Sequence, residues 1–499
     1  MLAMLFALEQ IASKLAPTES GWARTSCVRL PRYAGRSRSQ NGRLHVKVGP
    51  CSALPWNLSM PNLIAGRQPR HRLLGSCALL LALVQLSACA EPPANRIELA
   101  APRVATAAPV LPQTIAAPAA PVVQLSFSEW RDAFRREALA AGIQASTFER
   151  AFAGVVPDPA VIRADQSQPE FTRPVWEYLD SAVSTLRVHR GQRLLAEHAA
   201  TLHAIEQRYG VDRHTLVAIW GMESNFGSNM GNMNVIRSLA TLAHEGRRPQ
   251  FAHDQLLAAL TILEQGDVQA QNMQGSWAGA MGQTQFIPTT YQSYAVDFDG
   301  DGRRDIWDST ADALASTANY LSASGWKSGQ RWGMEVRLPQ GFDYALADPE
   351  QRKPLGEWLQ LGVRPQHPYS IVRDDSQMAT LVLPAGHRGP AFLVMDNFRS
   401  ILKYNNSTAY ALAISLLGER FHGGGQVLAS WPRNERPLSR SERIELQERL
   451  VQRGFDPGVP DGIIGANTRR AVRASQQQLG WPADGHPSYR LLEQLRQLP

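Results

Sequence analysis

The segment that most restricts the fold of this chain runs over residues 209–227, YGVDRHTLVAIWGMESNFG. Asp212 is a favourable N-cap for a helix, and Gly227 is suited to the turn that ends one. Counting back from Glu223 in helical steps gives three apolar residues on the same face as its carboxyl group. Those residues are Leu216, Ile219 and Trp220. The pattern therefore predicts a buried helix that carries an acid in its last turn.

The surroundings expected for Glu223 would change its chemistry. Burial penalises the carboxylate, and the C-terminal end of a helix dipole also disfavours negative charge. Both effects raise the pKa, so that the group can remain protonated near neutral pH and act as a general acid. The alternative is a structural Glu that caps or pairs within a helical core.

Most of the chain between residues 126 and 421 has helical periodicity. Ser126 with Glu129 has the spacing of a capping box, and helices are predicted over 187–209, 212–223, 254–264 and 310–324. Three glycines at 423–425 end this block. The sequence predicts a mainly α fold.

The charges and cysteines are unevenly distributed. Of the net charge of +7, residues 1–88 hold 11 basic and 2 acidic residues, which leaves 40 basic and 42 acidic residues in the rest of the chain. The rest of the chain therefore lacks the excess of positive charge that would favour nucleic acid as a partner. All four cysteines lie in the first 89 residues, so the globular part can form neither a disulfide framework nor a cysteine metal site.

Residues 60–89 have the features of a secretion signal. Three arginines precede an apolar stretch at 73–86 that is too short to remain as a membrane span. The following Leu86-Ser87-Ala88-Cys89 resembles the bacterial lipobox, which implies lipidation of Cys89. Ala90 follows instead of aspartate, and the resemblance then favours the outer membrane. An ordinary signal peptide is the alternative, and residues 1–59 remain unassigned, with an early start codon as the hypothesis.

Composition divides the remainder into segments. Residues 90–124 are rich in Ala, Pro and Val and predict an extended linker. We expect one large helical domain over 125–425, a short linker over 426–437 and a separate small unit over 438–499.

Three motifs carry a family resemblance: GMESNFG at 221–227, GSWAGAMGQTQFIP at 275–288 and KYNNS at 403–407. In this order they resemble the membrane-bound lytic murein transglycosylase B family. The resemblance implies a lysozyme-like helical catalytic domain, with Glu223 as the catalytic residue. It also implies substrate hydrogen bonds from Ser276 and Gln285. The residues implied to line the sugar cleft are Tyr178, Tyr320, Tyr404 and Asn405.

Each of these substrate residues has a structural alternative. Tyrosines at helical spacing are often core residues with a satisfied hydroxyl group. Ser276 could cap the next segment, and Gln285 could hold a loop. Gln283-Thr284 stands where many relatives carry an aromatic residue and a glycine, which affects the expected shape of the cleft near Gln285.

The reaction implied by the resemblance is lytic. Most glycosidases use two carboxylates, about 5 Å apart for retention or about 6.5–9.5 Å apart for inversion. No second Asp or Glu stands out in the sequence as a partner for Glu223. One carboxyl group suffices if the C6 hydroxyl of N-acetylmuramic acid attacks its own C1 and leaves a 1,6-anhydromuramoyl end. A lysozyme-like hydrolase of the same bond is the first alternative.

Residues 297–308, DFDGDGRRDIWD, follow the pattern of an EF-hand loop. Five aspartates in twelve residues repel one another unless a cation lies among them. We expect a structural Ca²⁺ here, and no cofactor for the chemistry itself. The ligands expected are Asp297, Asp299, Asp301, the Arg303 carbonyl and Asp308, with Asp305 at the ninth loop position.

The unit at 438–499 resembles the small three-helix peptidoglycan-binding domain. The resemblance rests on a DGIIG turn at 461–465, a second Asp-Gly pair at 484–485, and Gln447, Thr468 and Gln476 on the flanking helices. Together these features imply an outer-membrane lipoprotein that faces the periplasm and binds peptidoglycan glycan strands. Protein partners are expected among those of cell-wall synthesis or division. A non-catalytic peptidoglycan-binding lipoprotein is the second alternative.

Overall fold

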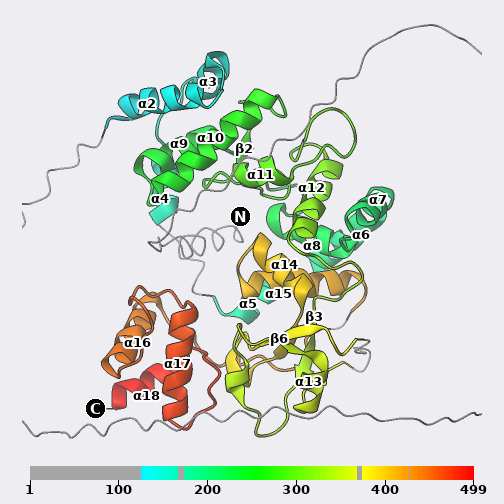
Figure 1. Cartoon of the computed structure of the whole chain (residues 1–499), viewed down its shortest axis with the longest axis vertical. Coiled ribbons are helices and arrows are strands. Elements are labelled where there is room, and N and C mark those ends of the chain that lie inside the picture. Colours follow the sequence, from blue (N-terminus) through cyan, green and yellow to red (C-terminus); the bar gives the residue numbers. More distant parts are fainter. Residues whose placement is uncertain (1–124, 167–172, 368–373, 425, 499) are drawn as a thin grey trace, which may run out of the picture. The chain divides into compact units, whose positions relative to one another are not determined.

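The computed structural model describes residues 125–166, 173–367, 374–424 and 426–498. All of these belong to one compact unit, and most of their secondary structure is helical, as the sequence predicts (Figure 1). None of the helices in these ranges has both the length and the apolar character needed to cross a membrane. The expected signal segment, Cys89 and the linker at 90–124 lie outside the described residues.

The helices, in chain order, are α2 (Phe127–Ala140), α3 (Ala145–Phe152), α4 (Pro159–Gln166), α5 (Val175–Ala182), α6 (Thr185–Glu197), α7 (Ala199–Tyr209), α8 (Arg213–Ser224), α9 (Val235–Glu245), α10 (Pro249–Gln265), α11 (Pro288–Tyr294), α12 (Thr310–Ala323), α13 (Leu355–Gln360), α14 (Asp396–Tyr404), α15 (Thr408–Phe421), α16 (Arg440–Gln452), α17 (Ala466–Gln478) and α18 (Tyr489–Gln497). The strands are β1 (Met233–Asn234), β2 (Gln274–Gly275), β3 (Gly333–Arg337), β4 (Lys353–Pro354), β5 (Arg364–Pro365), β6 (Met378–Val382) and β7 (Ala391–Val394).

Local capping chemistry explains several helix boundaries. The side chains of Ser126 and Glu129 form the expected reciprocal capping box at the start of α2. The prediction of one helix over 187–209 is wrong, because the backbone leaves the helical region at His198 and separates α6 from α7. Helix α10 begins earlier than predicted, at Pro249, a residue whose missing N–H is harmless in the first helical turn.

Two hydrophobic cores hold most of the helices together. One is formed mainly by α8, α12 and α15, and the other mainly by α9 and α10 together with aromatic residues of α2 and α3. Each fully buried Leu or Ile side chain contributes about 1.5–3 kcal/mol. Tyr320 of α12 and Tyr404 of α14 are half-buried and pack against both cores. These two predicted site residues therefore lie where the two cores meet.

A five-stranded antiparallel sheet interrupts the helical pattern, with strand order β4-β6-β7-β3-β5. Glu335 of β3 pairs with Phe392 of β7, and a separate core that includes the fully buried Trp358 packs against the sheet. The expectation of a mostly helical block from 126 to 421 did not include this sheet. Its strands are only two to five residues long, which is too short for alternation to stand out.

The three helices α16–α18 have a hydrophobic core of their own. In this three-helix unit, two glutamine side chains each accept a hydrogen bond from the backbone N–H of a turn glycine. Gln447 accepts the Gly462 N–H at 2.8 Å, and Gln476 accepts the Gly485 N–H at 2.8 Å. Gln476 also donates to Asp484. The glutamines and Asp-Gly pairs singled out in the sequence are thus hydrogen-bonded partners within this unit.

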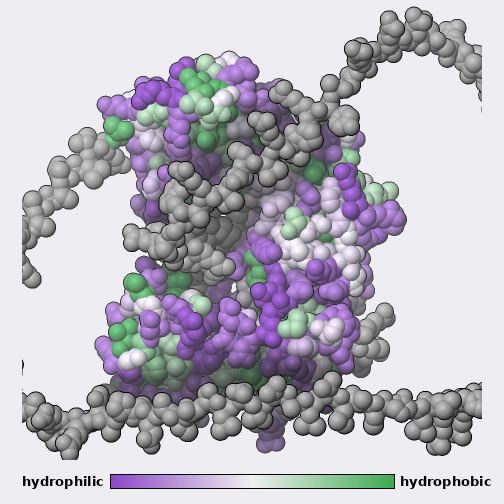
Figure 2. All heavy atoms as spheres, viewed as in Figure 1, coloured by the Kyte–Doolittle hydropathy of each residue, from purple (hydrophilic) through white to green (hydrophobic). Residues whose placement is uncertain are grey.

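The surface drawn in Figure 2 is mostly hydrophilic, and hydrophobic residues gather there only in small separate patches. Large hydrophobic side chains that are strongly exposed in the described residues include Leu186 and Val459. Scattered exposed residues of this kind are normal for globular proteins.

Candidate active site

Helix α8 positions Glu223, and both of its ends are held by side chains. Asp212 caps the N-terminus, where its Oδ1 accepts the Thr215 N–H at 3.0 Å, as the sequence predicts. At the other end, Ser224 Oγ donates to the carbonyl of Gln283 at 2.5 Å. The end of α8 is therefore fixed against the motif at 275–288.

The backbone around this helix end is strained. Asn225 and Phe226, the two residues after α8, have φ angles of 51° and 57°. Within the described residues, Gln285 is the only other non-glycine residue with a positive φ, at 55°. This left-handed region is unfavourable for residues with a Cβ, and such strain is often found at functional sites. All three residues belong to the motifs at 221–227 and 275–288.

Glu223 is buried, with 4% of its surface exposed. The hydroxyl group of Tyr410, from α15, donates a hydrogen bond of 2.7 Å to Oε1 of Glu223. Burial raises the pKa of Glu223, and the hydrogen bond from Tyr410 offsets this in part because it stabilises the carboxylate. The raised pKa predicted from the sequence is confirmed, so Glu223 can hold a proton at pH values where an exposed glutamate would be ionised.

Three tyrosines are electrostatically coupled to Glu223. The pKa values of Tyr178, Tyr404 and Tyr410 are all raised, first by burial and next by the negative charge of Glu223. These phenols therefore stay neutral and can donate hydrogen bonds. Tyr320 packs edge-on against Tyr404 with ring centroids 5.2 Å apart, and it donates to the Lys403 carbonyl at 2.6 Å. The structure thus brings the three predicted tyrosines near Glu223 or near one another.

Asn405 immediately follows α14 and is 1% exposed. Neither the Oδ1 nor the Nδ2 atom of its amide has a hydrogen-bond partner in the described part of the chain. Leaving a buried polar group unpaired costs about 1–3 kcal/mol. The amide of Asn405 is therefore available to a partner that the described residues do not supply.

Ser276 and Gln285 are both buried and both hold backbone in place. Ser276 Oγ accepts the N–H groups of Ala278 and Ala280 at 3.3 and 3.0 Å. Gln285 Nε2 donates to the carbonyls of Met230 and Gly282, each at 3.0 Å. These are the structural roles that the sequence left open for both residues. They also fix the segment against which α8 ends.

The acidic loop brings together only part of the expected ligand set. Asp297, Asp299 and Asp312 have carboxylate oxygens within 4.8 Å of one another. Asp301 instead pairs with the Arg303 side chain at 3.0 Å, and Asp308 lies outside the group. Asp312 is fully buried, and burial raises its pKa. Convergence of three carboxylates, one of them buried, fits an oxygen-preferring cation such as Ca²⁺.

Two models of known protein families match this chain. A family model described as "Transglycosylase SLT domain" matches residues 126–419, which is more than half of the chain. The chain belongs to the transglycosylase SLT domain family. A second model, described as "Putative peptidoglycan binding domain", matches residues 439–495 of this transglycosylase-family protein. The predicted fold class, a lysozyme-like helical domain followed by a small peptidoglycan-binding domain, is confirmed.

Several SLT-domain relatives have known structures or functions. SltB3 from Pseudomonas aeruginosa, solved with NAG-anhNAM-pentapeptide, is 67% identical, with a TM-score of 0.73 over 74% of this chain and 99% of that one. Membrane-bound lytic murein transglycosylase B from Escherichia coli (strain K12) is 32% identical over 48% of this chain and 66% of the relative's length, just under two thirds. The E. coli lytic transglycosylase Slt35 in complex with calcium is 28% identical, with a TM-score of 0.51 over 58% of this chain and 92% of that one.

Two residues of this SLT-domain site were missed by the sequence analysis. Tyr410 contacts Glu223 but lies three residues beyond the KYNNS motif, on an apolar helix where a tyrosine resembles ordinary core. Asp312 follows the acidic loop by four residues, in the first turn of α12, and so lies beyond the twelve positions that the loop pattern covers. What distinguishes both residues is a polar group that is buried in the fold. The burial of a single residue cannot be deduced from the spacing of residues in the sequence.

Proposed function

We propose that this SLT-domain protein is a lytic transglycosylase that cleaves the β-1,4 bond between N-acetylmuramic acid and N-acetylglucosamine in peptidoglycan. The observation that carries the proposal is the burial of Glu223, which raises the pKa of its carboxyl group, together with the hydrogen bond that Tyr410 donates to it. A protonated carboxyl group at neutral pH is what cleavage of a glycosidic bond needs from its acid.

Glu223 acts first as an acid and then as a base. Its proton passes to the glycosidic oxygen as the bond from that oxygen to C1 of N-acetylmuramic acid breaks, and the 2-acetamido group stabilises the positive charge that develops. The Glu223 carboxylate then takes the proton of the C6 hydroxyl, whose oxygen bonds to C1 of the same sugar. Glu223 ends protonated, and the product carries a 1,6-anhydromuramoyl end.

Two observations favour this intramolecular route over hydrolysis. The charge of Glu223 raises the pKa of Tyr178, Tyr404 and Tyr410 alike, so this single acid lies close to all three phenols. Well-oriented intramolecular attack reaches effective molarities of about 10⁵ M or more, which competes with bulk water. SltB3 binds a NAG-anhNAM-pentapeptide, and the anhydro sugar is the product that intramolecular attack leaves.

Mass analysis of muropeptides released from purified sacculi tests the proposal. Anhydromuramoyl ends are expected from the wild type and none from Glu223→Gln, which keeps the size of the side chain but cannot transfer the proton. Reducing ends would instead identify a hydrolase. Release that is unchanged by Glu223→Gln, or sacculus binding without release by either form, would contradict Glu223-dependent cleavage.

The residues around Glu223 have different roles in this proposal. Tyr178, Tyr320 and Tyr404 supply ring faces for the sugar, while the hydroxyl groups of Tyr320 and Tyr404 donate to the backbone carbonyls of Lys403 and Thr284. Asn405 supplies the unpaired amide, which matches the donor and acceptor of an N-acetyl group. For Ser276 and Gln285 we retain substrate contact as a proposal, alongside their observed backbone hydrogen bonds. Substituting either would then affect both KM and stability.

We propose that the acidic loop binds a structural Ca²⁺ and that no cofactor takes part in the chemistry. Asp297, Asp299 and Asp312 would hold the ion through carboxylate oxygens. Asp301, the Arg303 carbonyl and Asp308 remain proposed ligands. The bound ion would neutralise the converging carboxylates and stabilise the start of α12, which carries Tyr320.

The domain boundaries proposed are 125–425 for catalysis, 426–437 for a linker and 438–499 for peptidoglycan binding. The separate core of α16–α18 supports the last of these. A tethered second binding unit would raise the local concentration of glycan at Glu223. Binding to sacculi by the full chain and by a form lacking 438–499 tests this role.

The site of action follows from these proposals and from the N-terminal sequence. We propose that Cys89 is lipidated after cleavage of the signal at 60–89, that residues 90–124 tether the enzyme, and that it faces the periplasm from the outer membrane. Its partners are peptidoglycan strands, and proteins of cell-wall synthesis or division are proposed in addition. Mass analysis of the N-terminal peptide of the native protein would identify the lipid and the true start.

A further inference from the structure

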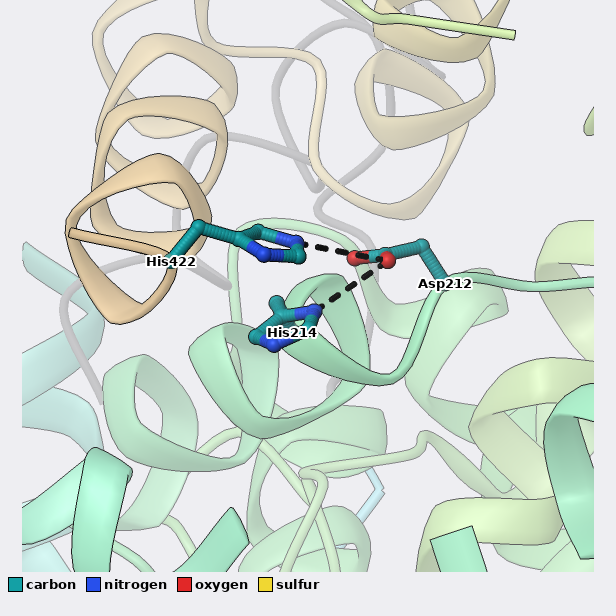
Figure 3. A group of neighbouring side chains, drawn as sticks. All are labelled: Asp212, His214 and His422. Atoms are coloured by element: carbon teal, nitrogen blue, oxygen red, sulfur yellow. Dashed lines mark hydrogen bonds and ion pairs between the residues drawn. The ribbon is translucent and has the colours of Figure 1, made fainter. Parts of the chain in front are cut away.

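Asp212, His214 and His422 form a compact group separate from the residues assigned to catalysis (Figure 3). Asp212 is the N-cap of α8, His214 lies in the first turn of that helix, and His422 is the C-cap of α15. Each side chain offers one ligand atom, and these atoms all lie within 4.8 Å of one another. Figure 3 shows both imidazole rings turned toward the carboxylate.

The distances are close to those of a metal site. Oδ2 of Asp212 lies 3.2 Å from Nδ1 of His214 and 3.9 Å from Nε2 of His422. Bonds of about 2.0–2.1 Å to a tetrahedral ion place neighbouring ligand atoms about 3.3 Å apart. The side chains of Asp212, His214 and His422 are 40%, 18% and 57% exposed, so an ion can enter from solvent.

The two carboxylate oxygens of Asp212 have different partners. Oδ1 accepts hydrogen bonds from the N–H and hydroxyl groups of Thr215, at 3.0 and 3.3 Å. Oδ2 faces the two imidazoles. The helix cap therefore holds the carboxylate in a fixed orientation, as hydrogen bonds to metal-binding carboxylates usually do.

We propose that Asp212, His214 and His422 bind a divalent transition-metal ion of the Zn²⁺ class, with water at the remaining coordination position. Two imidazole nitrogens and one carboxylate oxygen suit Zn²⁺, whereas Ca²⁺ and Mg²⁺ prefer oxygen ligands alone. This site therefore differs in chemistry from the acidic loop at 297–312.

Such an ion would join the two helices that carry Glu223 and its hydrogen-bond donor. Glu223 and Tyr410 meet at the C-terminal end of α8 and the N-terminal part of α15. The group of Asp212, His214 and His422 joins the opposite ends of the same two helices. A metal here would restrict sliding of α15 along α8 and would thereby hold Tyr410 in register with Glu223.

The test uses the purified, chelator-treated chain without an affinity tag, with excess Ca²⁺ present so that the acidic loop does not compete for the probe. Zn²⁺ is titrated by calorimetry and by thermal unfolding, and Co²⁺ is titrated by visible absorption. The variants are His422→Ala and His214→Ala, and the matched control is His189→Ala, an exposed histidine of α6. Asp212 is left intact because its substitution would also remove the cap of α8.

The expected result is one Zn²⁺ per chain, a Tm that rises with Zn²⁺ concentration and the absorption of tetrahedral Co²⁺. His422→Ala and His214→Ala should each weaken Zn²⁺ binding at least about tenfold, while His189→Ala should not. Absence of binding to the wild type would overturn the proposal. So would binding that both cluster variants retain, because the ion would then be held elsewhere. A failure of Glu223→Gln to stop cleavage would leave the metal proposal untouched.

Discussion

Replacing Tyr410 with Phe removes one hydroxyl group and leaves the ring that packs in the core around α8 and α15. The lost contact is the 2.7 Å hydrogen bond to Oε1 of Glu223. Hydrogen bonds to charged groups contribute about 1.5–3 kcal/mol. This energy applies to the carboxylate that forms as Glu223 gives up its proton, so bond cleavage should slow by about 10- to 100-fold in kcat.

The pH dependence of the same variant has a definite sign. The hydrogen bond from Tyr410 stabilises the carboxylate, so its loss raises the pKa of Glu223 further above the ordinary value. The active, protonated acid is present below this pKa and is lost as the pH rises through it. The basic limb of the kcat profile should therefore move to higher pH in Tyr410→Phe, although the maximal rate is lower.

The assay is release of soluble muropeptides from sacculi over a range of pH, quantified by mass analysis. Tyr291→Phe is the matched control, because Tyr291 is also fully buried and its hydroxyl group donates to the Arg304 carbonyl instead of Glu223. That control can lower stability but should leave the basic limb in place. A basic limb that stays fixed or moves to lower pH in Tyr410→Phe would refute the reasoning.

Four further outcomes are expected. Relative to Glu223→Gln, the wild type should lose stability as the pH rises from the ordinary carboxyl pKa to the raised pKa of Glu223, because the unfolded chain ionises at the lower pKa while the buried acid keeps its proton. The difference in Tm between the two proteins, compared at acidic and mildly alkaline pH, measures this loss. Asn405→Leu should raise stability by about 1 kcal/mol in denaturant unfolding, since an unpaired buried amide is removed, yet raise KM; a stability loss would mean that the amide is already satisfied. Ca²⁺ should raise the Tm of the wild type more than that of Asp312→Ala, which has no side-chain oxygen, and an equal rise in both would exclude Asp312 as a ligand. Removing residues 438–499 should lower sedimentation with sacculi and spare turnover of short glycans, because these residues contain their own core; equal loss of both would argue against independent domains.

The sequence was sufficient to predict those elements whose structure depends on neighbouring residues in the chain. Asp212 and the apolar face of α8 predicted a buried helix with Glu223 in its last turn, and the helix found is that one. The family motifs were sufficient for the lysozyme-like fold class. Non-local features could not be predicted in this way. The sheet of β3–β7 is built from short segments that become strands only by pairing across the chain.

The composition of the site was only partly predictable for the same reason. Tyr410 is 187 residues from Glu223 in the chain, and only the packing of α15 on α8 brings them together. Asp312 joins Asp297 and Asp299 because the loop folds back onto the start of α12. Spacing rules for a twelve-residue loop cannot select a ligand beyond the loop. For Ser276 the spacing was compatible with both substrate binding and turn capping, and the structure displays the capping contacts.

Several unfavourable features of the described structure fall in the three motifs, and buried polar atoms without a partner also occur elsewhere, at Ser238 and Thr380 for example. The buried acid Glu223 and the strained Asn225 and Phe226 belong to 221–227, the strained Gln285 belongs to 275–288, and the unpaired amide of Asn405 belongs to 403–407. Each of these features costs stability, while α8, which carries Glu223, has a capped N-terminus and a buried apolar face. Selection for stability alone would remove such costs, and an unpaired buried amide such as that of Asn405 has value when a ligand supplies its partner. The three motifs are far apart in sequence, and the proposed glycan substrate would touch all three, which accounts for these particular costs together.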